Sequence, residues 1–479
     1  MNSAFQAAVA RLALPMSSHA KTVASFNAFM LQLPPRRAKS GLSYQVASER
    51  AKALEEPKPQ GAPLSVLPAS ALLRSLLVAT VSSKPYLLRP TITFLSWLTR
   101  SNGGFLWNVD RNPILRGSLK NTFYKHFCAG ESTAEARENI QRMRSLGYRG
   151  AMLQNAKETV FDYKSKMAHG QGIASAANGD PARCKSIASW GKETLDTAAV
   201  LQDGDLLALK LTGAGPLVTE ALADVRLPPK PLMDVMHEVC VRCRDKGVRV
   251  LIDAESQHYQ EGIFLVGMEL SRQYNRDGYA VVYNTYQAYL KSTPGTLSRH
   301  LEAAAQEGFA LGLKLVRGAY MGTDERSLIH DTKKETDDAY NNIARELIQC
   351  QFGRLGAQGG LPFPSVELLL ASHNRESLVA AHKMHCDRTS RGLPTVRLDF
   401  AQLQGMADTL SLDLIQMRRK SGASVPNVYK CSTWGTLREC LAYLMRRATE
   451  NRDAVSRTAD EYLALKREVK RRLGFSSST

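Results

Sequence analysis

The stretch GLKLVRGAY, residues 312–320, decides the fold. Its first part is a short, mainly apolar run with one lysine inside it, and a glycine and a tyrosine follow. A near-continuous apolar run of this length is typical of a strand that is buried on both faces of a parallel sheet. The stretch therefore predicts a buried strand over 312–319, with Lys314 and Arg317 towards its C-terminal end.

Seven further runs of the same kind lie before and after it, separated by longer stretches with helical periodicity. They are Gly150–Asn155, Leu206–Thr212, Val248–Ala254, Ala280–Thr285, Val366–Ser372, Val396–Ala401 and Asn427–Cys431. Eight strands that alternate with helices over about 300 residues predict an α/β fold, a (β/α)8 barrel. A doubly wound open sheet is the alternative, but no GxGxxG follows a strand; Gly170-Gln171-Gly172 comes nearest and lacks the third glycine.

The N-terminal segment has the composition of a mitochondrial presequence. Residues 1–48 contain no Asp or Glu and are rich in Ser and Ala. Their basic residues are Arg11, Lys21, Arg36, Arg37 and Lys39. We therefore expect four parts: a presequence and linker over 1–60, a helical arm over 61–146, the barrel over 147–460 with its final helix across the mouth, and a basic tail over 461–479.

The chain is strongly basic. Its 63 Lys and Arg residues against 45 Asp and Glu give a net charge of +18, and removing the five presequence cations leaves +13. Such a field favours nucleic acid, anionic lipid or small anionic substrates. Neither a basic stripe with interleaved aromatics nor a recognition motif is present, so no nucleic-acid partner is expected. The tail KREVKRRL, residues 466–473, suits an anionic membrane surface, although a solvated terminal helix fits it equally well.

The eight cysteines are scattered and do not predict a metal site. Cys240 and Cys243 form a CxxC within a helical pattern, and no second pair follows at zinc-finger spacing. We therefore expect reduced thiols and no bound metal.

Polar residues recur where the predicted strands end. In a barrel of this kind, the functional residues stand at the C-terminal ends of the strands. The candidates are Lys210, Asp253, Glu255, Gln287, Tyr289, Lys314, Arg317, Tyr320, Ser372, His373, Asn374, Gln402 and Gln404. Because lysines at such ends can form imines, a Schiff-base aldolase is a rival enzyme class.

A helix predicted over 436–451 carries the sharpest local signal. Tyr443, Arg446, Arg447 and Glu450 fall at i, i+3, i+4 and i+7 and therefore share one face. Two arginines beside an aromatic ring can bind a small carboxylate, since arginine offers a planar fork that stays charged. A surface helix with an Arg446–Glu450 ion pair explains the same pattern, and the spacing alone does not separate the two.

Six motifs, in this order along the chain, resemble the proline dehydrogenase family. They are IDAE (252–255), YQAYL (286–290), KLVRGAY (314–320), ASHN (371–374), FAQLQGMAD (400–408) and AYLMRRATEN (442–451). The resemblance implies a distorted flavin-binding (β/α)8 barrel at the matrix side of the mitochondrial inner membrane. Such an enzyme oxidises L-proline to Δ1-pyrroline-5-carboxylate and passes the electrons through FAD to ubiquinone.

The resemblance also assigns roles to residues. Lys210, Arg446 and Arg447 would hold the substrate carboxylate, and Asp253, Tyr320 and Tyr443 would line the substrate pocket. The FAD contacts would be Gln287, Lys314, Arg317, Gly318, Ala319, Ser372, His373 and Glu450.

Two positions depart from the family pattern. Lys314 stands where bacterial members usually have arginine, so the contact to the flavin would lose the arginine fork. Cys431 stands where the family commonly has a tyrosine that packs on the substrate ring. A smaller residue there leaves room for a hydroxyl group, which makes 4-hydroxyproline the alternative substrate, unless Trp434 refills the space.

Overall fold

The computed structural model describes residues 62–100, 108–109, 111–170, 184–421, 426–450 and 455–475. Within these ranges the side chains of 99–100, 419–421, 442, 446–450 and 455–458 are not described. The chain divides into two units, Met1–Gln60 and Gly61–Thr479, and the described residues all belong to the second. The predicted presequence over 1–60 therefore lies outside them.

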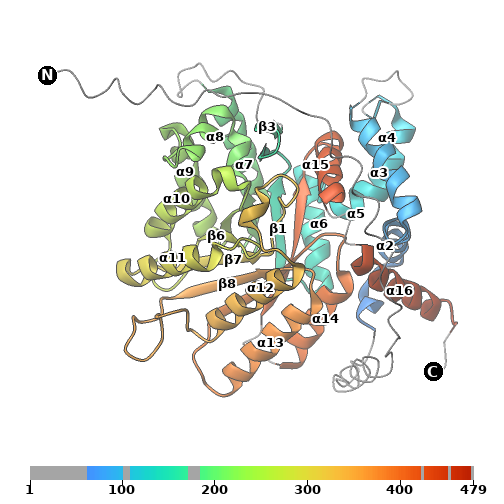
Figure 1. Cartoon of the computed structure of the whole chain (residues 1–479). Helices are drawn as coiled ribbons and strands as arrows, with labels where there is room; N and C mark the ends of the chain where they lie inside the picture. Colours follow the sequence, from blue (N-terminus) through green and yellow to red (C-terminus); the bar gives the residue numbers. More distant parts are fainter. Residues whose placement is uncertain are drawn as a thin grey trace, which may run out of the picture. The chain divides into compact units, whose positions relative to one another are not determined.

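Eight parallel strands form a closed barrel at the centre of this unit (Figure 1). They are β1 (Gly150–Asn155), β4 (Leu206–Leu209), β5 (Arg249–Ile252), β6 (Val282–Gln287), β7 (Leu311–Val316), β8 (Val366–Ala371), β9 (Arg397–Leu403) and β10 (Asn427–Trp434). β1 pairs with β10 from Gly150–Tyr429 to Asn155–Trp434, which closes the sheet and excludes the open-sheet alternative. The predicted (β/α)8 barrel is confirmed, and each of the eight predicted runs overlaps an observed strand.

Helices surround the barrel and alternate with its strands (Figure 1). They are α7 (Lys185–Val200), α9 (Lys230–Asp245), α10 (Gln257–Tyr274), α11 (Thr293–Glu307), α12 (Lys333–Ile348), α13 (Arg375–Ser390), α14 (Asp408–Ser421) and α15 (Leu437–Glu450). A short helix, α8 (Pro216–Ala223), precedes α9, and an antiparallel hairpin of β2 (Thr159–Asp162) and β3 (Met167–Gly170) follows β1. The sequence did not predict the hairpin.

Alternate strand residues fill the barrel, because successive side chains of a strand point to opposite faces. Its middle is apolar, with Met152, Leu206, Leu251, Leu369 and Tyr429 in one buried cluster. Gly312 has no side chain because a Cβ there would lie 2.4 Å from the Val282 carbonyl oxygen. The polar ends of the barrel above and below this layer are therefore separated from each other by packed side chains.

The helical arm begins with a short turn (Pro63–Val66) and leads to β1. Its helices are α2 (Ala69–Ser82), α3 (Pro85–Arg100), α4 (Pro113–Leu119), α5 (Lys125–Phe127) and α6 (Thr133–Leu146), with a π-helical turn over Lys120–Tyr124. α3 packs against α15, where Leu95 and Leu98 share a buried cluster with Leu437, Leu441 and Met445. The arm therefore supports the helix that carries the Tyr443 face.

The C-terminal helix α16 (Val455–Arg472) packs against α2. Leu465 and Glu468 are buried on its inner side. The Arg472 guanidinium donates hydrogen bonds to the carbonyls of Leu64, Ser65 and Leu67 at 3.1, 3.1 and 2.8 Å. No helix in the described ranges is long and apolar enough to cross a bilayer.

Candidate active site

Two buried lysines lie at the C-terminal end of the barrel interior, directly above the apolar layer. Lys314 continues the inward-facing side of β7, and its Nζ lies 2.5 Å from Oδ1 of Asp253, which follows β5. Lys210 follows β4, and its Nζ lies 2.7 Å from Oε2 of Glu158. All four side chains are at most 11% exposed, so the charges are paired away from bulk water.

Glu158 connects two of the predicted substrate residues, and the sequence analysis missed it. It lies between β1 and β2 and is 1% exposed. In addition to the ion pair with Lys210, its carboxylate accepts a hydrogen bond from the Tyr320 hydroxyl at 3.3 Å. Glu158 follows the end of a barrel strand by three residues. The rule that selected the other strand-end residues would have selected it too.

Glu255 adds a second buried carboxyl group beside this pair. The Thr212 backbone N–H donates to it at 3.1 Å, and the Thr212 hydroxyl donates as well. Burial raises the pKa of Glu255 to about 7, against the opposing influence of the Lys210 charge and the Thr212 hydrogen bonds. The nearby Glu158 carboxylate raises it further.

Helix α15 meets the barrel mouth through Tyr443. The Gln154 amide, from β1, donates to the Tyr443 hydroxyl and to Thr433 Oγ1, both at 2.9 Å. The Tyr443 ring centroid lies 5.9 Å from Lys210 Nζ. The structure thus brings Tyr443 and Lys210 together, as predicted. Arg446, Arg447 and Glu450 follow in α15, and their side chains lie outside the described part of the structure.

Cys431, which stands where the family commonly has a tyrosine, lies near Lys210, Asp253 and Lys314. It packs against the apolar cluster inside the barrel and is half-buried. Burial raises the pKa of its thiol to about 11, and Lys314, Asp253 and Lys210 are the charged groups that act on it. Trp434 does not fill the space beside it, because its indole N–H donates to the Thr197 hydroxyl of α7 at 3.0 Å. The suggestion that Trp434 refills the gap is wrong, since β10 directs residues 431 and 434 to opposite faces.

Arg317 and Ser372, two of the predicted FAD residues, contact each other in the barrel wall. The Arg317 guanidinium donates to Ser372 Oγ at 2.5 Å and to Ser377 Oγ at 2.9 Å, and it pairs with Asp337 at 2.8 Å. It also lies 4.2 Å above the Tyr340 ring. Arg317 therefore connects β7 with α12 and α13, and its contacts within the protein are extensive.

The remaining predicted FAD residues lie near these strand ends. His373 accepts the Leu403 N–H on Nε2 at 3.1 Å, which assigns the proton of the neutral ring to Nδ1. Gly318 and Ala319 are exposed in the loop after β7. Gly318 has φ 141°, and a Cβ there would meet the Tyr289 ring at 2.3 Å, so the loop runs close to that ring.

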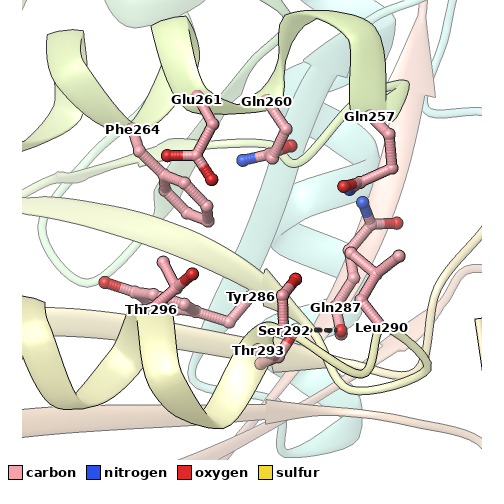
Figure 2. A pocket seen from close by; sticks show the side chains of 10 residues that line it. All are labelled: Gln257, Gln260, Glu261, Phe264, Tyr286, Gln287, Leu290, Ser292, Thr293 and Thr296. Atoms are coloured by element: carbon pink, nitrogen blue, oxygen red, sulfur yellow. Dashed lines mark hydrogen bonds between the residues drawn. The ribbon is translucent and has the colours of Figure 1, made fainter. Parts of the chain in front are cut away.

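Gln287 lies at the edge of a pocket between α10 and α11, with a volume of about 280 Å³ that includes open solvent (Figure 2). Its amide donates to the Glu255 carbonyl at 3.2 Å, and its own backbone carbonyl accepts from the Thr293 hydroxyl at 2.5 Å. Within the described part of the chain, the amide nitrogens of Gln257 and Gln260 have no hydrogen-bond partner. The wall beside Gln287 thus offers donors to a ligand oxygen or to water.

Two strand-end candidates belong elsewhere. Tyr289 donates to Asp324 at 2.6 Å, and Gln404 bonds to Asn139 and Ser432 at the junction with the arm. Both have structural partners and do not join the Lys210 group. Among the described residues, no three His, Cys, Asp or Glu side chains could together hold a metal ion.

The donors at the mouth fit a flavin dinucleotide. A flavin ring system presents carbonyl oxygens and nitrogens, and its pyrophosphate is anionic, so it needs hydrogen-bond donors and cations. Lys314 supplies a buried cation, His373 a ring N–H, and Gln287 an amide. The assignment of these residues to FAD stays a prediction.

A family model described as proline dehydrogenase matches residues 136–460. The probable mitochondrial proline dehydrogenase of Schizosaccharomyces pombe is 28% identical, covering 84% of this chain and 88% of its own length. The hydroxyproline dehydrogenase of Mus musculus is 30% identical, covering 84% of this chain and 91% of its own.

Among solved structures, proline utilization A from Bdellovibrio bacteriovorus superposes with a TM-score of 0.59 at 18% identity. The match covers 87% of this chain and 42% of that longer protein. At this identity the likeness shows the fold alone.

Proposed function

Because this chain belongs to the proline dehydrogenase family, a family of oxidoreductases, we propose that it oxidises L-proline to Δ1-pyrroline-5-carboxylate with FAD as cofactor. The electrons then pass to ubiquinone. The observation that carries the proposal is the meeting of Lys210, Tyr320 and Tyr443 at one barrel mouth, with Asp253 and Lys314 beside them.

Substrate binding rests on the cations at the mouth. Lys210 would bind the proline carboxylate, together with Arg446 and Arg447, which follow Tyr443 on α15 by one turn. Proline is small, so anchoring its carboxylate fixes the position of its ring. The Tyr443 ring and the Tyr320 hydroxyl would close the pocket around that ring, and Asp253 would complete its polar wall.

The cofactor would lie against the donors of the neighbouring strands. Lys314, Gln287, Ser372 and His373 would face it, with Gly318 and Ala319 in the adjoining loop and Arg317 and Glu450 supporting the edge. When bound, the flavin supplies the acceptor for a hydride from the proline carbon next to nitrogen. The charge of Lys314 would stabilise negative charge that develops on the flavin.

Lys210 and Lys314 suit the role of charge anchors better than that of imine-forming amines. Each Nζ is engaged in a short ion pair with a buried carboxylate, so it is poorly placed to attack a substrate carbonyl carbon. Borohydride trapping of a substrate adduct on either lysine would support the aldolase alternative instead.

We also place the enzyme at the matrix side of the mitochondrial inner membrane, as a peripheral protein. The Schizosaccharomyces pombe relative is named mitochondrial, and the composition of residues 1–48 supports import by a presequence. The net charge of +13 beyond that segment suits contact with anionic lipid, where ubiquinone is dissolved.

A second candidate substrate is trans-4-hydroxy-L-proline. Cys431, small and half-buried beside Lys314 and Lys210, leaves room at the substrate ring, and Trp434 points away from it. The similarity to the mouse hydroxyproline dehydrogenase supports the same alternative.

Steady-state kinetics on the purified protein test the proposal. We expect flavin absorbance, reduction of a quinone analogue by L-proline, and a higher kcat/KM for L-proline than for trans-4-hydroxy-L-proline. A reversed ratio would select the second candidate. A protein without flavin that oxidises neither amino acid would contradict both.

A further inference from the structure

The outer face of α3 exposes three aromatic side chains, alongside Arg89 and Thr93. Its inner face is buried through Leu95 and Leu98, while Tyr86, Phe94 and Trp97 are 68%, 43% and 45% exposed. Phe94 and Trp97 stack on each other with ring centroids 6.3 Å apart. Exposed tryptophan and tyrosine on one helix are typical of a surface that meets the interface between lipid and water.

Helix α2, which packs against α3, also exposes apolar side chains. Leu73 and Leu77, one helical turn apart, are 58% and 52% exposed, and Val66 before the helix is 40% exposed. Exposed apolar side chains are ordinary when they are scattered singly. Here Leu73, Leu77, Tyr86, Phe94 and Trp97 lie on two consecutive helices that pack against each other, and Val66 lies just before the first of them.

The charge of this region has a single sign. Residues 57–109 contain no Asp or Glu; the cations Lys84, between α2 and α3, and Arg89, exposed on α3, lie beside this surface, whereas Arg74 of α2 is partly buried. A surface that faces only water ordinarily carries charges of both signs. Cations around apolar side chains complement the phosphate headgroups above a hydrocarbon layer.

Helix α16 adds further cations next to α2. Arg472 and Leu465 hold it there, and Lys84 Nζ lies 5.9 Å above the Tyr462 ring. Lys466, Arg467 and Lys470 are exposed on α16. The basic residues of α16 are thus held beside α2. They can contact a membrane together with the apolar helices.

We propose that the outer faces of α2 and α3, termed here the arm face (Val66, Leu73, Leu77, Tyr86, Phe94 and Trp97), insert into the surface of an anionic bilayer, with the α16 cations against its headgroups. The inference rests on the proposed function for its biological setting, and it names the surface that makes the membrane contact. α3 packs on α15, so the arm face lies directly behind the helix that carries Tyr443.

Vesicle binding tests the proposal on the full chain. We expect the protein to bind phosphatidylcholine vesicles that contain cardiolipin, to bind pure phosphatidylcholine vesicles more weakly, and to dissociate as salt increases. The variant Leu73→Gln/Leu77→Gln/Trp97→Gln should bind the cardiolipin vesicles about tenfold more weakly. The matched control Leu227→Gln/Val241→Gln, on α9 and the loop before it, changes residues that are 44% and 38% exposed and should bind as the wild type does.

Two results would overturn the proposal. The arm-face variant could bind vesicles as tightly as the wild type. The variant could also lose a dimer that the wild type forms in sedimentation while its vesicle binding stays the same. That result would make the arm face an interface between two copies of the chain. Oxidation of proline by a water-soluble dye is followed in parallel. If the variant loses vesicle binding but still reduces the dye, the result supports the arm face as the membrane contact. If the wild type does not reduce the dye, the result counts against the proposed function alone.

Discussion

At the scale of single residues, the Lys210–Glu158 pair combines a role in folding with one in binding. Both side chains are buried, so removing one partner leaves an uncompensated charge. We expect Lys210→Met to destabilise the fold by about 3 kcal/mol and Lys210→Met/Glu158→Gln to recover much of that loss. Both variants should keep a KM for proline raised at least about tenfold. Urea unfolding and steady-state kinetics measure the two effects separately.

A result in which the double variant also regained the wild-type KM would contradict the role of Lys210 as a carboxylate anchor. The arginines of α15 give an independent check. Arg446→Ala and Arg447→Ala should each raise the KM about tenfold while the flavin absorbance is retained.

The buried carboxyl group of Glu255 makes stability depend on pH. Its folded pKa of about 7 is raised above the ordinary value of 4.5, so folding favours the protonated form. That contribution is fully present below about pH 4.5 and is lost as pH rises through about 7. Glu255→Gln cannot ionise, so its stability relative to the wild type should rise by up to about 3 kcal/mol between pH 5 and pH 8. Thermal unfolding at several pH values measures this.

The variant Glu220→Gln, at an exposed position on α8, provides the control for replacing a surface glutamate. If the stability of Glu255→Gln relative to the wild type changed with pH no more than that of Glu220→Gln, the folded protein would not hold Glu255 in its protonated form.

The size of residue 431 should set the preference between the two amino acids. Cys431→Tyr would place a ring over the space that a 4-hydroxyl group needs. We expect the selectivity for hydroxyproline over proline, measured as the ratio of the two kcat/KM values, to fall roughly tenfold or more. This corresponds to about 1–3 kcal/mol of transition-state free energy. Cys431→Ala keeps the side chain small and should leave the ratio near that of the wild type. If Cys431→Tyr left the ratio unchanged, residue 431 would not contact the substrate ring.

At the scale of secondary structure, the position of α15 depends on the arm. Leu98 of α3 is 3% exposed and packs in a cluster with Leu437, Leu441 and Met445. Leu98→Ala should cost about 2–5 kcal/mol of stability through the cavity it leaves. It should also raise the KM for proline, because α15 carries the Tyr443 face. As a control, Leu77→Ala, at an exposed position, should change neither the stability nor the KM appreciably. If Leu98→Ala were destabilised but kept the wild-type KM, the arm would not determine the position of the Tyr443 face.

The barrel strands were predictable because burial on both faces leaves a short, near-continuous apolar run in the sequence. Val366–Ala371 is such a run, and its predicted end differs from the observed one by a single residue. The hairpin β2–β3 left no such signal, because its residues are largely exposed or only half-buried. Its position follows instead from contacts such as that between Thr159 and Thr212, which are 53 positions apart.

The site was predictable to the extent that it follows strand ends and family motifs. Lys210, Tyr320 and Tyr443 do meet at one mouth. The contacts of Arg317 could not be foreseen, because its partners Asp337, Ser372 and Ser377 lie on segments whose approach only the folded barrel defines. Glu158 was missed although it obeys the strand-end rule.

At the scale of the whole described unit, the first and last segments contact each other. β1 pairs with β10, and Arg472 donates to the carbonyl of Leu64, 408 positions earlier in the chain. Contacts between residues so far apart form late in folding. The chain must lose the entropy of closing a long loop before the contact contributes any stabilising energy.

The contact between α2 and α16 has a consequence for how the protein is made. Since α2 and α3 precede α15 and α16 in the chain, they leave the ribosome long before those helices exist to cover their inner faces. Until then Leu72, Leu95 and Leu98, each nearly inaccessible in the finished fold, have no native surface to pack on. The nascent chain therefore carries two uncovered apolar helices through most of its synthesis, and its yield in a cell will depend on chaperones that hold them.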